Sequence, residues 1–130
     1  EMIHDTRIVP VDGRHHIASG IRQYLGDSRG GWQGDTLVIE TTNFTDRTGV
    51  QGGNGNGLRH SEGMRLTEHF TRIADSVLLY DMTIDDPEVF VEPWVRPTRV
   101  LRPGGGDGIQ PERAFCEVYE EGNVTTQLRH

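Results

Sequence analysis

Lysine is absent from this sequence of 130 residues, and all 13 basic residues are arginine. The absence excludes Schiff-base chemistry on a lysine, a lysine general base and the lysine of a phosphate-binding P-loop. Positive charge is also outweighed, because 20 acidic residues leave a net charge of −7. Nucleic acids and anionic membrane surfaces favour basic partners. We therefore expect no nucleic acid as a partner.

Cysteine and long apolar runs are scarce as well. Cys116 is the single cysteine, so no internal disulfide can form and the fold depends on packing. No apolar run approaches the ~18 residues of a membrane-spanning helix, which predicts no direct membrane insertion. The sequence begins at Glu1, without a recognisable signal-peptide pattern. We expect a mature or trimmed chain.

The apolar residues that are present, 33% of the chain, repeat with a period of two rather than 3.6. This period is typical of strands that are buried on one face. Glycine, proline, asparagine and aspartate separate the apolar runs, as they separate the strands of a meander. The pattern predicts five to seven short strands, and the clearest runs are 2–11, 35–44, 64–73, 76–84, 94–101 and 113–121.

The two runs with the cleanest alternation, 64–73 and 76–84, are separated by two residues. Such a short connection predicts an antiparallel hairpin. Pro97 marks its strand as an edge or a bulge, because proline has no N–H for a sheet ladder. At most a short helix is expected, over residues 17–25. The predicted fold class is all-β: an antiparallel meander, barrel-like or a strongly curved sheet, in a single domain over residues 1–130.

Glycine-rich runs lie at 51–57 and 103–108. The first run does not fit a dinucleotide fingerprint, which needs glycines spaced G-x-G-x-x-G before a helix. Leu58 and His60 stand at the later glycine positions, and a strand-like run follows instead of a helix. It begins like a calcium-binding repeat, but Gly57 occupies the acid position and there is one copy only. We interpret both runs as loops, since glycine and asparagine tolerate positive φ.

Glu68, Glu40 and Asp81 stand in strand-like runs, each in phase with apolar neighbours. If those neighbours face a barrel interior, the carboxylates face it too. A buried carboxylate without a partner is costly, and its pKa rises towards that of a general acid or base. The alternative is that each acid pairs with an arginine or lies on an outward face, and the 13 arginines make such pairing easy to satisfy. Both a functional acid and structural ion pairs remain open.

His60 and Glu62 are two residues apart and would share one face of a strand, with Cα atoms ~7 Å apart. They could supply two metal ligands, or a base and the carboxylate that orients it. The spacing indicates no third ligand. We therefore expect no metal and no cofactor. A metal site at His60 and Glu62 remains the weaker alternative.

Trp32 and Trp94 each stand at the start of a strand-like run. Small β-barrels often place a tryptophan across one end, and the sequence around Trp32 is compatible with this position. The other interpretation is that both indoles contact a ligand or a protein partner, since tryptophan is common on such surfaces.

Four blocks of the sequence resemble a known group of proteins. They are RIVPVDGRHH, YLGDSRGGWQGDTLVIETTNFTD, SEGMRLTEHFTRIADSVLLYDMTIDDPEVFVEPW and CEVYEEGN. The chain resembles uncharacterised, exported proteins of soil bacteria such as Acidobacteria and Gemmatimonadota. The resemblance covers nearly the whole chain, and its most specific motifs are W-x-G-D-T-L and T-I-D-D-P. It implies a β-rich structure, a periplasmic or extracellular location, and a longer precursor of which this chain is the C-terminal part. It supplies no activity and no catalytic residue.

The absence of a recognisable catalytic constellation leads to one functional hypothesis. The chain is expected to be a non-enzymatic, exported binding or assembly module, an accessory subunit whose partners are other protein chains. The alternative is a small β-barrel enzyme that uses Glu68, Glu40 or Asp81, with His60, for acid–base chemistry on a small hydrophobic substrate. A small-molecule ligand is compatible with either hypothesis.

Overall fold

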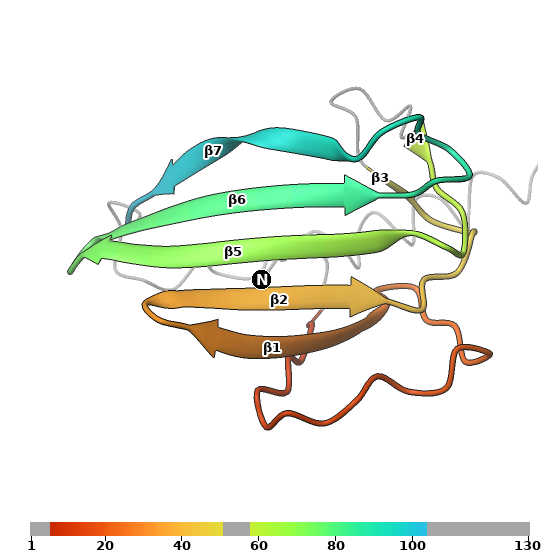
Figure 1. Ribbon diagram of the computed structural model, residues 1–130, viewed down its shortest axis with the longest axis horizontal. Coiled ribbons are helices and arrows are strands. Elements are labelled where there is room, and N and C mark those ends of the chain that lie inside the picture. Colours follow the sequence, from red (N-terminus) through yellow and green to blue (C-terminus); the bar gives the residue numbers. More distant parts are fainter. Residues whose placement is uncertain (1–5, 51–57, 104–130) are drawn as a thin grey trace, which may run out of the picture. The chain divides into compact units, whose positions relative to one another are not determined.

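Five antiparallel strands form one sheet in the computed structural model, which describes residues 6–50 and 58–103 (Figure 1). The strands lie side by side in the order β1-β2-β5-β6-β7, and a separate two-stranded sheet, β3 with β4, interrupts the chain between β2 and β5. The bounds are β1 Asp27–Gln33, β2 Thr36–Thr42, β3 Gly49–Val50, β4 Leu58–Arg59, β5 Arg65–Ala74, β6 Val77–Asp85 and β7 Trp94–Leu101. The predicted all-β antiparallel meander is confirmed.

The chain divides into two compact units, and the sheet belongs to the larger one, Arg7–Pro103. The single domain over residues 1–130 therefore stays a prediction. Three expected features lie outside the described residues: the strand at 113–121, the glycine run at 51–57, and the run at 103–108 apart from its first residue.

The sheet is open and does not close into a barrel. β1 and β7 are its two edges, and they do not pair with each other within the described residues. Pro97 lies in β7, and the β6–β7 register shifts close to it, between Tyr80 and Met82. The predicted edge or bulge position of Pro97 is therefore confirmed, whereas barrel closure is wrong for the described strands.

Directly paired residues of antiparallel strands lie on the same side of a sheet, so the register defines two faces. The core face carries Ile39, Leu66, Glu68, Phe70, Tyr80, Met82 and Ile84, and the outer face carries Glu40, Thr67, His69 and Asp81. The predicted alternation in β5 and β6, and the hairpin that joins them, are confirmed.

The densest packing lies at the end of the sheet where β2 and β6 end and β5 begins (Figure 1). Phe44, Met64 and Ile84 are buried together there. Beside them Asp86 is fully buried, and its carboxylate accepts hydrogen bonds from the Ser61 N–H and hydroxyl, both at 2.7 Å. This carboxylate ties the turn after β6 to the turn before β5.

No helix forms over residues 17–25, so this expectation is wrong. The side-chain amide of Asn43 donates to the carbonyls of Ile17, Ala18 and Ile21, at 3.4, 2.9 and 3.0 Å. In an α-helix these carbonyls would accept N–H groups from residues four positions further along the chain. Because Asn43 satisfies them instead, the segment forms turns.

Residues 6–11, the described part of the strand expected at 2–11, do not form a strand. They belong to a segment that lies beside β1, which we call the strap (residues 7–17; Figure 1). The Gly30 N–H donates to the Pro10 carbonyl at 2.8 Å. Pro10 has no N–H to return to β1, so a regular ladder cannot form there.

Candidate functional site

The three candidate acids lie on different faces of the sheet. Glu68 lies on the core face, as predicted, whereas Glu40 and Asp81 lie opposite Thr67 and His69 on the outer face. Of the two alternatives, the interior position therefore holds for Glu68 and the outward position for Glu40 and Asp81. Both alternating phases of β2 and β6 contain apolar residues, so the sequence pattern alone does not identify the core-facing phase.

Glu68 is a buried carboxylate held by two side chains, and it remains only 5% exposed. The Tyr80 hydroxyl donates to its Oε1 at 2.8 Å, and the Arg7 guanidinium lies 2.6 Å from its Oε2. The Arg7 N–H is not aligned for a hydrogen bond, so among the described residues charge alone holds Oε2. Phe70 stacks on Tyr80 with ring centroids 4.7 Å apart and fixes the phenol in place.

Burial and the hydrogen bond to Glu68 raise the pKa of Tyr80 from an ordinary 10.0 to about 12. Because the folded-state pKa is raised, the neutral phenol stabilises the fold fully below pH 10.0, and this contribution is lost as the pH rises to about 12. We expect the tyrosinate absorbance to show a step near pH 12 that Tyr80→Phe removes. Tyr24→Phe is the matched control, because Tyr24 is exposed, and it should retain the step. If the step survives in Tyr80→Phe, the contact with Glu68 does not control this ionisation.

His16 of the strap lies between two carboxylates on the outer face. Its Nδ1 is 2.9 Å from Oδ2 of Asp27, and its Nε2 is 3.3 Å from Oε1 of Glu40. Two guanidinium groups complete the cluster: Arg29 lies 2.7 Å from Asp27, and Arg65 lies 3.6 Å from Glu40. The cluster joins the strap to β1, β2 and β5.

Asp27 is the most buried member of this cluster, with a side chain that is 9% exposed. Burial alone would raise the pKa of Asp27, but hydrogen bonds from the Ile17 N–H, from His16 and from Arg29 outweigh it and lower this pKa below 3.8. Asp27 is therefore a carboxylate at neutral and mildly acidic pH. The sequence did not single out His16, because no local pattern signals its contacts with distant strands.

Each candidate acid has a polar or cationic partner. Asp81 accepts a hydrogen bond from the Thr98 hydroxyl of β7, while Glu68 and Glu40 have arginine partners. Such pairing occupies the carboxylate oxygens, which suits a structural role better than proton transfer.

His60 and Glu62 have separate partners. The Nδ1–H of His60 donates to the Ser61 carbonyl at 3.0 Å, which leaves Nε2 to accept from the Thr48 hydroxyl at 2.8 Å. Glu62 is exposed and pairs with Arg22 at 3.3 Å. No group of three histidine, cysteine or acidic side chains is placed to hold a metal ion in residues 6–50 and 58–103. The weaker alternative of a metal at His60 and Glu62 therefore gains no support.

The two tryptophans occupy different environments. Trp32, near the end of β1, is 67% exposed and does not plug the end of a barrel. Trp94 opens β7 and is 36% exposed. Its ring lies 6.3 Å from the Phe90 ring and 5.8 Å from the Arg96 guanidinium. Only Trp94 therefore has an aromatic neighbour among the described contacts.

The edge strand β7 presents an apolar and basic surface that the sequence analysis did not single out. Val95 and Val100 are 66% and 56% exposed on this strand. Residues 94–102 contain three arginines and no acid, although the chain as a whole carries a charge of −7. Val95 and Val100 lie on the outer face, opposite Thr83 and Leu79, whereas Arg96, Arg99 and Leu101 lie on the core face, opposite Met82, Tyr80 and Leu78. We call these five residues together with Arg102, on both sides of the edge strand, the β7 surface.

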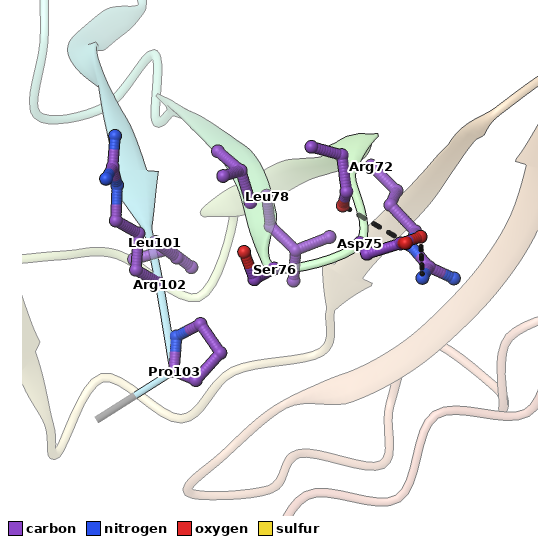
Figure 2. A pocket seen from close by; sticks show the side chains of 9 residues that line it. Arg72, Asp75, Ser76, Leu78, Leu101, Arg102 and Pro103 are labelled. Carbon is purple, nitrogen blue, oxygen red and sulfur yellow. Dashed lines mark hydrogen bonds and ion pairs between the residues drawn. The ribbon is translucent and has the colours of Figure 1, made fainter. Parts of the chain in front are cut away.

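A hollow of about 470 Å³ adjoins the end of β7 at the turn between β5 and β6 (Figure 2). Its walls include the apolar side chains of Leu78 in β6 and Leu101 in β7. Arg72 at this turn pairs with Asp75 at 3.0 Å, as the dashed line in Figure 2 marks. Leu78 and Leu101 are paired on the core face, so the hollow adjoins β7 on the side opposite Val95 and Val100.

Comparison with protein-family models, with curated proteins and with solved structures finds no match to this chain. The resemblance to exported proteins of soil bacteria therefore stays a prediction. Among the described residues there is no helix of the length and apolar character that crossing a membrane requires.

Proposed function

We propose that this chain is a non-enzymatic binding or assembly module, an accessory subunit that docks another protein chain on the β7 surface. The observation that carries the proposal is the exposure of Val95 and Val100 on an edge strand. Both side chains lie on the same face of the strand, opposite Thr83 and Leu79, and exposed apolar side chains on a sheet edge are suited to contact a protein partner. Among the described residues the buried hydrophobic side chains are few, so docking would add apolar burial. They are Ile39, Phe44, Met64 and Ile84.

The arginines of β7 indicate the chemistry of the partner. Arg96, Arg99 and Arg102 would repel a basic surface and a second copy of the same strand. Pro97 has no N–H and discourages the addition of another strand to this edge. The partner that fits therefore wraps around the edge of β7, with apolar side chains against Val95 and Val100 on the outer face and acidic side chains towards the arginines on the core face.

The pairing of the candidate acids supports a module rather than an enzyme. Glu68 is held by Arg7 and Tyr80, and Asp81 accepts from Thr98 within the same sheet. A general acid or base must reach the proton that it transfers. The resemblance to exported proteins supports a periplasmic or extracellular location.

The native mass of the protein, isolated gently from its source with its companions identified by mass spectrometry, tests the proposal. We expect a complex well above the 14.6 kDa of the chain, and we expect it to weaken with salt because arginine contributes to docking. Val95→Ser combined with Val100→Ser should release the companion. Val91→Ser is the matched control, because Val91 is fully exposed outside the strands, and it should retain the companion.

Two results would contradict the proposal. One is a protein that runs alone at 14.6 kDa at every salt concentration. The other is a companion that the double valine variant still binds while the melting temperature of the variant equals that of the wild type. The companion would then dock on another surface.

A second candidate function, an acid–base enzyme, rests on Glu68 alone. The observation that favours it is a buried carboxylate whose Oε2 has no hydrogen bond among the described residues. Proton transfer would require Arg7 to leave Oε2, because a substrate must come within hydrogen-bond reach of the carboxylate. Glu40 and Asp81 do not belong to this candidate site, since they lie on the outer face.

A further inference from the structure

The strap is anchored to the sheet around one titratable side chain. The Gly30 N–H of β1 donates to the Pro10 carbonyl at 2.8 Å, and the Ile17 N–H donates to Oδ2 of Asp27 at 3.1 Å. Between these two anchors, His16 turns its two ring nitrogens towards carboxylates of β1 and β2. The protonation state of the His16 imidazole therefore determines which hydrogen bonds connect the strap to β1 and β2.

A neutral imidazole has one N–H, whereas His16 has a carboxylate oxygen at each nitrogen. When Nδ1–H donates to Asp27, the neutral ring directs the lone pair of Nε2 at Oε1 of Glu40. A second proton converts this contact into an N–H that donates to a carboxylate. We propose that His16 is a proton-operated clasp: protonation tightens the strap on β1 and β2, and deprotonation loosens it.

The other charged groups around His16 limit the effect without removing it. Arg29 lies 2.7 Å from Asp27, and with a proton on Nδ1 His16 donates to Asp27 whether or not Nε2 is protonated. Arg65 competes for Glu40, but it lies 3.6 Å away with a side chain that is 56% exposed, so water screens it. The change on protonation is therefore concentrated at the contact between His16 and Glu40.

Within the strap, the nearest charged or titratable side chains are those of Asp12, Arg14 and His15. Asp12 and Arg14 form an exposed pair with each other. His15 contributes its backbone carbonyl, which accepts from Arg29 at 2.9 Å, and its side chain is exposed. Replacement of the His15 ring therefore provides a control next to the clasp.

The clasp has a consequence for the edge of the sheet. β1 is an edge strand, and the Gly30 N–H is one of its backbone donors that the strap occupies. An unoccupied edge donor is available for pairing with another strand. The strap is thus a cover for the β1 edge whose hold depends on pH, and this inference is independent of docking on β7.

Amide hydrogen exchange of the full chain between about pH 5 and pH 8, the range in which histidine ordinarily changes charge, tests the clasp. After correction for intrinsic exchange, we expect the Gly30 and Ile17 amides to be about two- to fivefold better protected at the acidic end, the range for a partly exposed ion pair. His16→Gln should lower this protection and make it independent of pH. His15→Gln should behave like the wild type.

The ring nitrogens of His16, followed by NMR in the wild-type chain, keep the test decisive if a variant folds poorly. We expect the Gly30 amide to change with the same midpoint as the second proton on His16, and Glu40→Gln should reduce the amplitude. Protection at Gly30 that stays constant while His16 titrates would overturn the proposal. A pH-dependent protection that persists in His16→Gln would overturn it as well.

Discussion

Replacing Gly26 with alanine is expected to lower the free energy of unfolding by about 2–6 kcal/mol, the sum of backbone strain and overpacking. Gly26 has a φ of 68°, in the left-handed region that residues with a Cβ rarely adopt. An added Cβ would lie 2.7 Å from Cγ2 of Thr41 and from the carbonyl of Thr42, and 2.8 Å from the Phe44 ring. Thr41 and Phe44 are buried, and the carbonyl is backbone, so none of the three can move cheaply.

A comparison of Gly26→Ala with Gly34→Ala by chemical denaturation separates the backbone strain from the overpacking. Gly34 has a φ of 58° in the turn between β1 and β2, but no atom lies within 4 Å of the position of its added Cβ. Gly34→Ala should therefore cost only the conformational part, about 1–2 kcal/mol. Equal losses in the two variants would show that the packing around Gly26 yields, contrary to the close contacts.

The strands were predictable where local pattern and burial agree. β5 and β6 alternate cleanly, their connection is short, and the hairpin follows from these two facts. The helix prediction for residues 17–25 was wrong because three carbonyls of this segment accept from Asn43, more than 20 residues away. Local propensity carries no information about such a contact, and tertiary hydrogen bonds override it.

The candidate site was predictable only in part, for a similar reason. Glu68 was correctly placed on the core face, because Leu66 and Phe70 of β5 set a clear phase. In β2 the residues on both sides of the strand include apolar ones. The outward position of Glu40 therefore follows only from the pairing of β2 with β5, which the sequence pattern does not reveal. The partners His16 and Arg7 both come from the strap, whose path beside β1 no pattern indicates.

Removal of the Arg7 side chain, in Arg7→Ala, is expected to lower the free energy of unfolding by about 3 kcal/mol. Glu68 is 5% exposed, so the variant leaves a buried carboxylate without its cation. The estimate lies at the low end for a broken buried pair, because the Arg7 side chain is 31% exposed and water already screens part of its charge. Denaturant unfolding followed by circular dichroism measures the loss.

Glu68→Gln and the double variant complete a thermodynamic cycle with Arg7→Ala. Glutamine retains an acceptor for the Tyr80 hydroxyl and removes the charge, so the double variant should be more stable than Arg7→Ala alone. The coupling between the two side chains should be on the order of 1–3 kcal/mol. Additive losses would mean that the close Arg7–Glu68 contact does not stabilise the fold.

The same variants also discriminate between the two candidate functions. If Glu68 acts as a general base, Arg7→Ala should raise its reactivity towards a substrate, because the guanidinium blocks Oε2 in the wild type. If the pair is structural, Arg7→Ala should lower stability while docking on β7 persists under conditions in which the variant remains folded. The pair and the β7 surface share no residue, so a loss of docking in the folded variant would show that the two are coupled through the sheet.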